Sequence, residues 1–132
     1  MIFIDSNIPM YLVGTEHANK HVARRLLESC INRNERLVTS AEVLQEILHR
    51  CVSIDRRDAI QPTFDALLNV VDQVYPVETR DVERAKTLLQ GVTAISARDA
   101  LHVAVMQRYD IARIMSFDAG FDRVTTVERV AE

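Results

Sequence analysis

The sequence contains little of what links or interrupts domains. Its 132 residues include three glycines and three prolines, with neither a low-complexity tract nor an internal repeat. Because flexible linkers are rich in such residues, we predict a single domain over residues 1–132. No hydrophobic run approaches the ~20 residues of a membrane helix, and no basic segment precedes the N-terminal apolar stretch as in a signal peptide. A cytoplasmic protein without membrane contact is therefore expected.

Cysteine and lysine are also scarce. Cys30 and Cys51 fall in segments with helical periodicity and lack the spacing of metal ligands, so reduced, packed thiols are expected. Only two of the sixteen basic residues are lysines, and the formal net charge is −3, which does not indicate a nucleic-acid binder. Arginine suits forked contacts with phosphates or with carboxylates of a partner protein, although a general preference for arginine codons would explain the same composition.

What the sequence does contain is an alternation of short β-prone runs with longer amphipathic segments. Ile2, Phe3 and Ile4 form the first run, and Pro9 and Gly14 mark the first turn and the end of the helix that follows. Further strands are expected at 37–39, 74–77, 112–116 and 125–127, and helices at 17–32, 41–52, 55–71, 79–89 and 96–108. This order predicts an α/β fold with a central parallel sheet of four to five short strands, covered by helices on both faces.

Local signals suggest where some of these elements begin or end. Ser40 is placed to cap the helix that follows it, and the segment 55–58 resembles an acidic helix start. Pro76 places its strand near a sheet edge, because proline cannot donate to a strand ladder. The helix that begins at Asp55 is expected to bury a stripe formed by Ile60, Phe64, Leu67, Leu68 and Val71.

Two acidic residues follow strands of the predicted sheet. Asp5 follows the first strand, and Asp118 follows the strand that ends at Ser116. Ligands of open parallel sheets collect beyond the carboxyl ends of the strands, so both carboxylates emerge together if these strands are neighbours. Taken alone, Asp5 suits a turn or a helix cap slightly better, and Asp122 lies close enough to be confused with Asp118.

Two of the expected helices carry further acidic residues. Glu42 and Glu46 are four residues apart on one helix face, so periodicity does not choose between them, and a solvated glutamate is the ordinary interpretation of either. Ser96 and Asp99 have the spacing of a capping box, which is compatible with a functional carboxylate at a helix N-terminus. His102 shares the face of Asp99, where a packed structural histidine is more common than a metal ligand.

The ordered set of these motifs resembles the PIN-domain nucleases, and most closely the VapC-type toxins of prokaryotic toxin–antitoxin pairs. The motifs are Asp5-Ser6-Asn7, Glu46 in a helix after the second strand, the run from Ser96 to His102, and Ser116-Phe117-Asp118. The resemblance extends from Ile2 to about Val130, and its specificity lies in the order of the motifs. Ser6 stands where threonine is usual, a departure that retains the hydroxyl group.

The resemblance implies a three-layer α/β/α PIN-like fold, and it favours Glu46 over Glu42 and Asp118 over Asp122. Crowded carboxylates repel one another, and a divalent cation that accepts oxygen ligands, Mg²⁺ or Mn²⁺, removes this repulsion. The implied catalytic residues are Asp5, Glu46, Asp99 and Asp118, with Asp5, Asp99 and Asp118 as metal ligands and Glu46 and Asp122 as auxiliaries.

The implied activity is hydrolysis of RNA phosphodiester bonds by a homodimeric toxin that a VapB-type antitoxin silences. A net charge of −3 and an exposed carboxylate cluster suit the basic residues of such an antitoxin. The arginines that could meet RNA phosphates are Arg24, Arg25, Arg56, Arg57 and Arg98, although a solvated helix face is the more common role of any one of them.

Three other functions fit part of the sequence. Glu46 and His49, like Asp99 and His102, have the spacing of di-iron carboxylate bundles, but the β-prone runs argue against a four-helix scaffold. A PIN-like module that only binds protein is disfavoured because all four acidic positions are occupied. A phosphatase of the haloacid dehalogenase type requires a second aspartate two residues after its first, where this chain has Asn7.

Overall fold

The protein, described over residues 1–92 and 94–130 in a computed structural model, is built on a five-stranded parallel sheet. The strands are β1 (Ile2–Ile4), β2 (Leu37–Ser40), β3 (Gln73–Tyr75), β4 (Arg113–Met115) and β5 (Glu128–Val130). Their order is β3-β2-β1-β4-β5, so the chain winds outward from β1 in both directions. The predicted α/β fold is confirmed, and the strands that precede Asp5 and Asp118 are neighbours.

The central position of β1 follows from its composition. Ile2, Phe3 and Ile4 are each 0% exposed, as expected for a short apolar run that lacks a polar face. Phe3 lies opposite Val38 of β2 on one side and Ile114 of β4 on the other. Since β1 is paired along both edges and covered on both faces, the residue that follows it emerges at the centre of the sheet.

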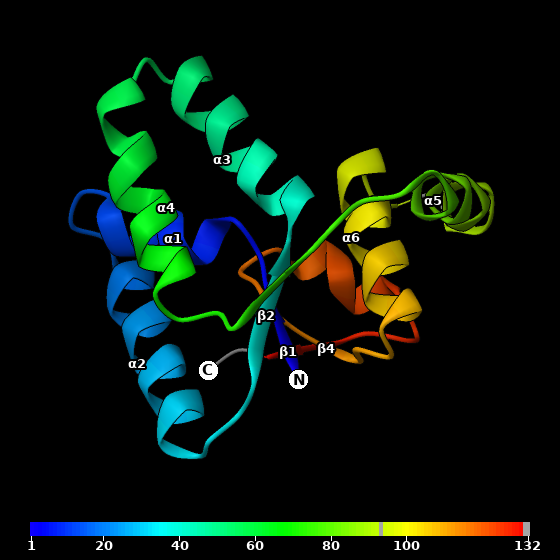
Figure 1. The fold of residues 1–132 in the computed structure, drawn as a ribbon, viewed down its shortest axis with the longest axis horizontal. Helices are drawn as coiled ribbons and strands as arrows, with labels where there is room; N and C mark the ends of the chain where they lie inside the picture. The colour runs from blue at the N-terminus through cyan, green and yellow to red at the C-terminus, as the bar shows by residue number, and fades with distance from the viewer. Residues whose placement is uncertain (93, 131–132) are drawn as a thin grey trace.

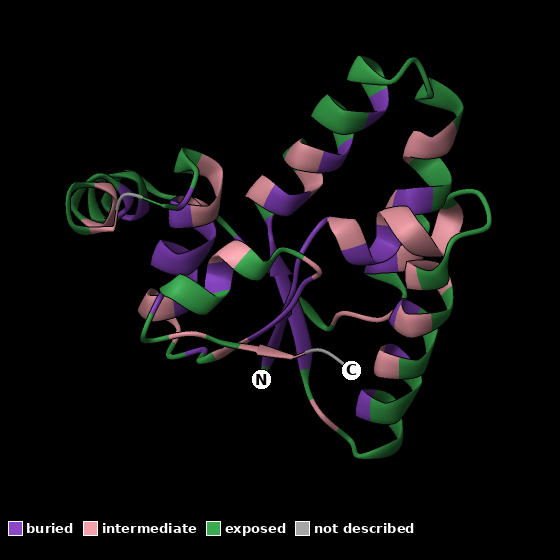
Figure 2. Ribbon diagram, turned by 180° about the vertical axis from the view of Figure 1, so that it is seen from behind, coloured by how far each residue is buried: buried purple, intermediate pink, exposed green. Residues whose placement is uncertain are grey.

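Helices cover the sheet on both faces (Figure 1). They are α1 (Asn7–Val13), α2 (Ala18–Asn32), α3 (Ala41–Ser53), α4 (Ile60–Leu68), α5 (Thr79–Gly91) and α6 (Ala97–Arg108). Helix α1 packs against α2 and α4 on one side, whereas α5 and α6 pack together on the other. Helix α3 contacts both α4 and α6, so it spans the two groups near the carboxyl ends of the strands. Figure 2 shows that buried residues concentrate in the strands and on the helix faces turned toward them.

The helix predicted to begin at Asp55 begins later. Asp55 has a left-handed φ of 58°, a conformation that follows the end of a helix rather than starting one. A short 3₁₀ helix, Arg57–Ala59, comes next, and α4 starts at Ile60. Asp58 accepts two hydrogen bonds from the Arg56 guanidinium, at 3.0 and 3.1 Å, so its carboxylate serves a local ion pair instead of a cap.

Other element boundaries agree with the sequence to different degrees. The sequence predicts the fifth strand at 125–127, but the chain pairs with β4 only over 128–130. Ser40 directly precedes α3 as predicted, although its side chain makes no capping hydrogen bond. Pro76 follows the last residue of β3, which is an edge strand as the missing proline N–H predicts.

Cys30 and Cys51 are both free and buried, as predicted for packed thiols. Across the part of the chain that the structure describes, no helix has the length and apolar character needed to cross a membrane. The stripe predicted for α4 is buried only in part: Leu67 is 1% exposed, whereas Leu68 is 42% exposed.

This difference generates a first prediction. Leu67→Ala should lower the free energy of unfolding by about 2–5 kcal/mol, because it removes buried methyl groups and leaves a cavity. Leu68→Ala, the matched control on the same turn, should change it by less than about 1 kcal/mol. Urea unfolding followed by circular dichroism measures both values, and equal losses would contradict the different burial of the two leucines.

Candidate active site

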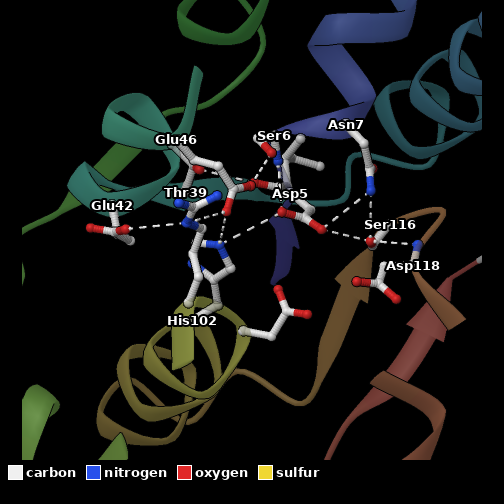
Figure 3. A network of polar contacts seen from close by, with 12 residues as sticks. Asp5, Ser6, Asn7, Thr39, Glu42, Glu46, His102, Ser116 and Asp118 are labelled. Carbon is white, nitrogen blue, oxygen red and sulfur yellow. Dashed lines mark hydrogen bonds and ion pairs between the residues drawn. The ribbon is translucent and has the colours of Figure 1, made fainter. Parts of the chain in front are cut away.

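The carboxyl ends of β1 and β4 meet at a buried aspartate. Asp5 is 3% exposed, and its amide donates to the Met115 carbonyl at 3.1 Å, which continues the pairing of β1 with β4. Its Oδ1 accepts a hydrogen bond from the Ser6 amide (2.8 Å), and its Oδ2 accepts one from the Ser116 hydroxyl (2.6 Å; Figure 3). Groups from both strand ends therefore orient this carboxylate.

Asn7 and Ser116 connect the two loops that follow these strands. The Asn7 Nδ2 donates to the Ser116 hydroxyl at 3.2 Å, and the Phe117 amide donates to the Asn7 Oδ1 at 3.2 Å. The Ser116 hydroxyl also accepts a hydrogen bond from the Asp118 amide at 3.0 Å. The sequence motifs included Asn7 and Ser116 without indicating these roles, which depend on the pairing of β1 with β4.

Helix α3 brings Glu46 to the same place. Its Oε1 accepts a hydrogen bond from the Ser6 hydroxyl, and its Oε2 lies 3.4 Å from the Arg98 Nε. Glu42, one turn earlier, lies 3.9 Å from the Arg98 Nε, on the side of Arg98 away from the cluster. Of the two glutamates that periodicity could not separate, Glu46 is therefore the one within the cluster, and Glu42 lies at its rim (Figure 3).

Asp99 and Asp118 form a second acidic pair. The Asp99 amide donates to the Ser96 hydroxyl at 3.1 Å, which is the serine half of the predicted capping box. Burial, followed by a hydrogen bond with the Asp118 carboxyl and the negative charge of Asp5, raises the pKa of Asp99 to about 7. A hydrogen bond between two carboxyl groups requires a proton on one of them, so near neutral pH this pair carries fewer than two negative charges.

Asp118 and Asp122 have different partners. The Asp118 Oδ1 accepts a hydrogen bond from the Gly120 amide at 2.8 Å, which caps the short helix η2 (Ala119–Arg123). Asp122 lies within that helix, and its carboxylate accepts two hydrogen bonds from the Arg129 guanidinium, at 3.0 and 3.2 Å. The guanidinium lowers the pKa of Asp122. The structure thus joins Asp118 to Asp99 and leaves the carboxylate of Asp122 engaged by Arg129.

His102, which the sequence favoured as a packed structural residue, lies within the site. Its side chain is 0% exposed, and its Nε2 lies 3.4 Å from the Glu46 Oε2 and 3.7 Å from the Asp5 Oδ1. The sequence placed it on the face of Asp99 and favoured a packed structural role, which is half correct, since the ring also packs 5.6 Å from that of Phe3. The spacing from Asp99 was the only available signal, because Asp5 and Glu46 approach His102 from other elements.

Two opposing effects, burial and the charges of neighbouring groups, determine the pKa shifts in the cluster. Burial raises the pKa of Asp5 above its usual value, even though His102 and the Ser116 hydroxyl favour the ionised form. Burial acts in the same direction on Glu46, but His102, Ser6 and Arg98 outweigh it and lower the pKa. For His102 burial favours the neutral ring, whereas the carboxylates of Glu46 and Asp5 prevail and raise the pKa.

These residues fit a divalent cation. Asp5, Glu46 and His102 each offer one ligand atom, and the three atoms lie within 4.8 Å of one another. Asp99 and Asp118 add further carboxylate oxygens, which are the ligands that Mg²⁺ and Mn²⁺ prefer. Burial and then the neighbouring carboxyl groups of Asp118 and Asp5 raise the pKa of Asp99, and a bound cation would favour its ionised form.

Comparison with known proteins agrees with this geometry. A family profile described as the PIN domain matches residues 2–127, and the chain therefore belongs to the PIN-domain family. Within that family, its relatives are VapC ribonucleases. The chain is 60% identical to ribonuclease VapC13 of Mycobacterium tuberculosis over 131 residues, which cover 99% of this chain and 100% of that protein. It is 40% identical to ribonuclease VapC23 of the same species over 118 residues, or 89% and 93% of the two chains.

Among solved structures, the crystal structure of M. tuberculosis VapC20, described as a sarcin-ricin loop cleaving toxin, matches with a TM-score of 0.82 and 26% identity over the full length of both chains. The predicted three-layer fold is therefore shared with a VapC toxin. A five-stranded parallel sheet also rules out the four-helix scaffold that a di-iron site would need.

The acidic pair generates a second prediction, which concerns stability. The folded-state pKa of Asp99, about 7, lies above the ordinary value of 3.8, so its contribution to stability is fully present below about pH 4 and is lost as the pH rises through 7. Asp99→Asn retains a neutral hydrogen-bonding group at every pH. In EDTA, the stability of Asp99→Asn relative to the unmodified protein should increase by about 1–2 kcal/mol as the pH rises from 5 to 8, because solvent screens part of the interaction of this half-buried group. Urea unfolding at several pH values measures this difference, and a constant difference would refute the assigned pKa.

Proposed function

We propose that this protein is the toxin of a VapBC-type toxin–antitoxin pair, and that it is an endoribonuclease that hydrolyses RNA phosphodiester bonds with Mg²⁺ or Mn²⁺. The observation that carries this proposal is the convergence of Asp5, Glu46, Asp99 and Asp118 from four separate parts of the chain. The names of relatives that are 60% and 40% identical support the ribonuclease activity. We assign this function to one PIN domain over residues 1–132, acting in the cytoplasm.

In the proposed site, Asp5, Asp99 and Asp118 hold the metal ion. When bound, a divalent cation stabilises the charge that develops on the phosphate and makes a water molecule more acidic. Asp5 is held in one orientation by Ser6 and Ser116, so it can bind the cation without first being ordered. Asp99 would lose its proton and its hydrogen bond with Asp118 on binding, since both carboxylates then face a positive charge.

Glu46 has a separate role in the proposed mechanism. Its oxygens are already engaged by Ser6, Arg98 and His102, and its pKa is lowered, so it remains ionised beside the metal ligands. An ionised carboxylate in this position can accept a hydrogen bond from the attacking water and orient it. Asp122 can act as an auxiliary ligand only if it leaves Arg129, so we assign it a lesser part.

RNA binding requires positive groups near these acids. Of the five candidate arginines, Arg98 lies at the cluster: its Nε is 3.4 Å from Glu46, and its side chain is 39% exposed. Arg56 is paired with Asp58 in the segment before α4. We therefore propose that Arg98 contacts a phosphate of the RNA close to the scissile bond.

A protein that only binds partners through a PIN-like fold is the alternative function. It does not require Asp5 and Asp99 to be intact carboxylates, whereas hydrolysis does.

The third prediction distinguishes a ribonuclease from such a binding protein. Purified protein should cleave RNA at discrete positions with Mg²⁺ or Mn²⁺ and not with EDTA, and Asp5→Ala and Asp99→Ala should each lower the rate by more than about 100-fold, since the cation supplies several kcal/mol of transition-state stabilisation.

Labelled total RNA, separated on a sequencing gel, provides the measurement. Asp58→Ala is a matched control, because it removes an exposed aspartate that pairs with Arg56 outside the cluster. It should cleave at the unmodified rate. Metal-independent cleavage, or equal cleavage by all four proteins, would indicate a contaminating nuclease and count against the proposed mechanism.

The fourth prediction concerns partners. We propose that the protein forms a homodimer and that a VapB-type antitoxin, whose basic residues reach the acidic site, inhibits it. VapBC structures among the structural neighbours support an antitoxin partner. Light scattering after gel filtration should give twice the 15.0-kDa chain mass, and a stoichiometric antitoxin should abolish cleavage. A monomeric mass, or undiminished cleavage in the complex, would contradict the corresponding part of the proposal.

A further inference from the structure

His102 is buried in the molecule without an ordinary hydrogen-bond partner. Its side chain is 0% exposed, and neither ring nitrogen makes a hydrogen bond of normal geometry with the residues that the structure describes. Buried polar atoms in folded proteins are nearly always paired, because leaving them unpaired forfeits their interaction with water. An apolar side chain of similar size would avoid this cost, so we expect the histidine to do more than fill space.

The ring is directed at two of the four acidic residues. Its Nε2 lies 3.4 Å from the Glu46 Oε2 and 3.7 Å from the Asp5 Oδ1 (Figure 3). Packing against Phe3 beneath it, with 5.6 Å between ring centroids, limits how the imidazole can turn. A displacement of about 0.5 Å would bring the Glu46 contact to the usual length of an N–H···O hydrogen bond.

We propose that His102 is a positioning residue that holds Glu46 and Asp5 side by side at the metal site. The inference rests on the proposed function, since it assigns His102 a part in that site. The Nε2 atom carries a proton both in the imidazolium ion and in one neutral tautomer, so the contact does not depend on the charge of the ring. A group behind the metal ligands that fixes their orientation commonly alters metal affinity or activity by 10- to 100-fold.

Arg98 does not replace His102 in this role. It contacts Glu46 and Glu42 from the rim, and its side chain is 39% exposed, so packing holds it less firmly than a buried side chain. His102 touches both Glu46 and Asp5 and is fully enclosed, so its position is set by packing. Removing it would leave two carboxylates facing each other without the donor that separates them.

The fifth prediction compares three variants of His102 with a packing control. In His102→Gln the amide nitrogen takes the place of Nε2, in His102→Asn it takes the place of Nδ1, and His102→Leu has no donor. Met106→Ala removes a buried side chain one turn along α6 that carries no charge, so it lowers stability without touching the acids.

Binding of Mn²⁺ alone, measured by the paramagnetic resonance of the free ion, is the main readout because it requires neither RNA nor turnover. His102→Leu and His102→Asn should weaken Mn²⁺ binding by about 10- to 100-fold, whereas His102→Gln and Met106→Ala should remain within a few-fold of the unmodified protein. In RNA cleavage, the Leu and Asn variants should lose kcat with little change in KM at saturating Mn²⁺.

The direction of the change in Mn²⁺ affinity, and its pattern among the variants, test the proposed role of His102. Unchanged Mn²⁺ binding in His102→Leu would overturn the proposal by showing that the ring only fills space, and tighter binding would show that it acts only as a competing positive charge. If His102→Leu does not fold, equal Mn²⁺ binding by the Gln and Asn variants overturns it instead. Failure of the unmodified protein to cleave any RNA would count against the proposed function and leave the Mn²⁺ comparison intact.

Discussion

A carboxylate at the buried carboxyl end of the central strand is the constraint on which the rest of the structure depends. Asp5 is 3% exposed, and an ionised group in such a position is tolerated only with hydrogen-bond donors and a counter-charge nearby. The Ser6 amide and the Ser116 hydroxyl supply the donors, and the Nε2 of His102 lies 3.7 Å from the Asp5 Oδ1. Because Ser116 follows β4, satisfying Asp5 also ties together the loops that leave the two central strands. The strand order reverses at β1, and these contacts place oriented polar groups in the crevice beyond its carboxyl end.

Charge alternation between two helices extends this arrangement to the surface. Glu42 and Glu46 lie one turn apart on α3, and Arg98 and His102 lie one turn apart on α6. The contacts run from Glu42 to Arg98, then to Glu46, His102 and finally Asp5, at separations between 3.4 and 3.9 Å. Each acid inside this series has a basic neighbour, which explains how α3 can bring a glutamate against a buried aspartate. Arg98, whose side chain is 39% exposed, lies at the solvent end of this series and offers a guanidinium beside the acids.

How much the sequence predicted follows from which interactions are local. Strands and helices were predictable because parallel strands are short apolar runs and helices carry a periodic face. The helix start at Asp55 was predicted wrongly because Asp55 lies in a left-handed turn and Asp58 pairs with Arg56. The last strand lies at 128–130 instead of 125–127 because its register is set by pairing with β4. Periodicity could not choose between Glu42 and Glu46, because the choice depends on residues of other elements. The contacts of His102 were not predictable, since they join segments about 55 and 100 residues away.

The repulsion between neighbouring carboxylates is reduced in a different way in each of two acidic pairs. Asp5 and Glu46 share a basic group, His102, which keeps Glu46 ionised while the pair remains close. For Asp99, burial and then a hydrogen bond with the Asp118 carboxyl raise the pKa to about 7, so this second pair is relieved of charge by a proton. A cation that enters the cluster gains most where negative charge is least compensated, and it displaces a proton more readily than a packed histidine. We therefore expect a metal ion in this cluster to bind beside Asp5 and the Asp99–Asp118 pair.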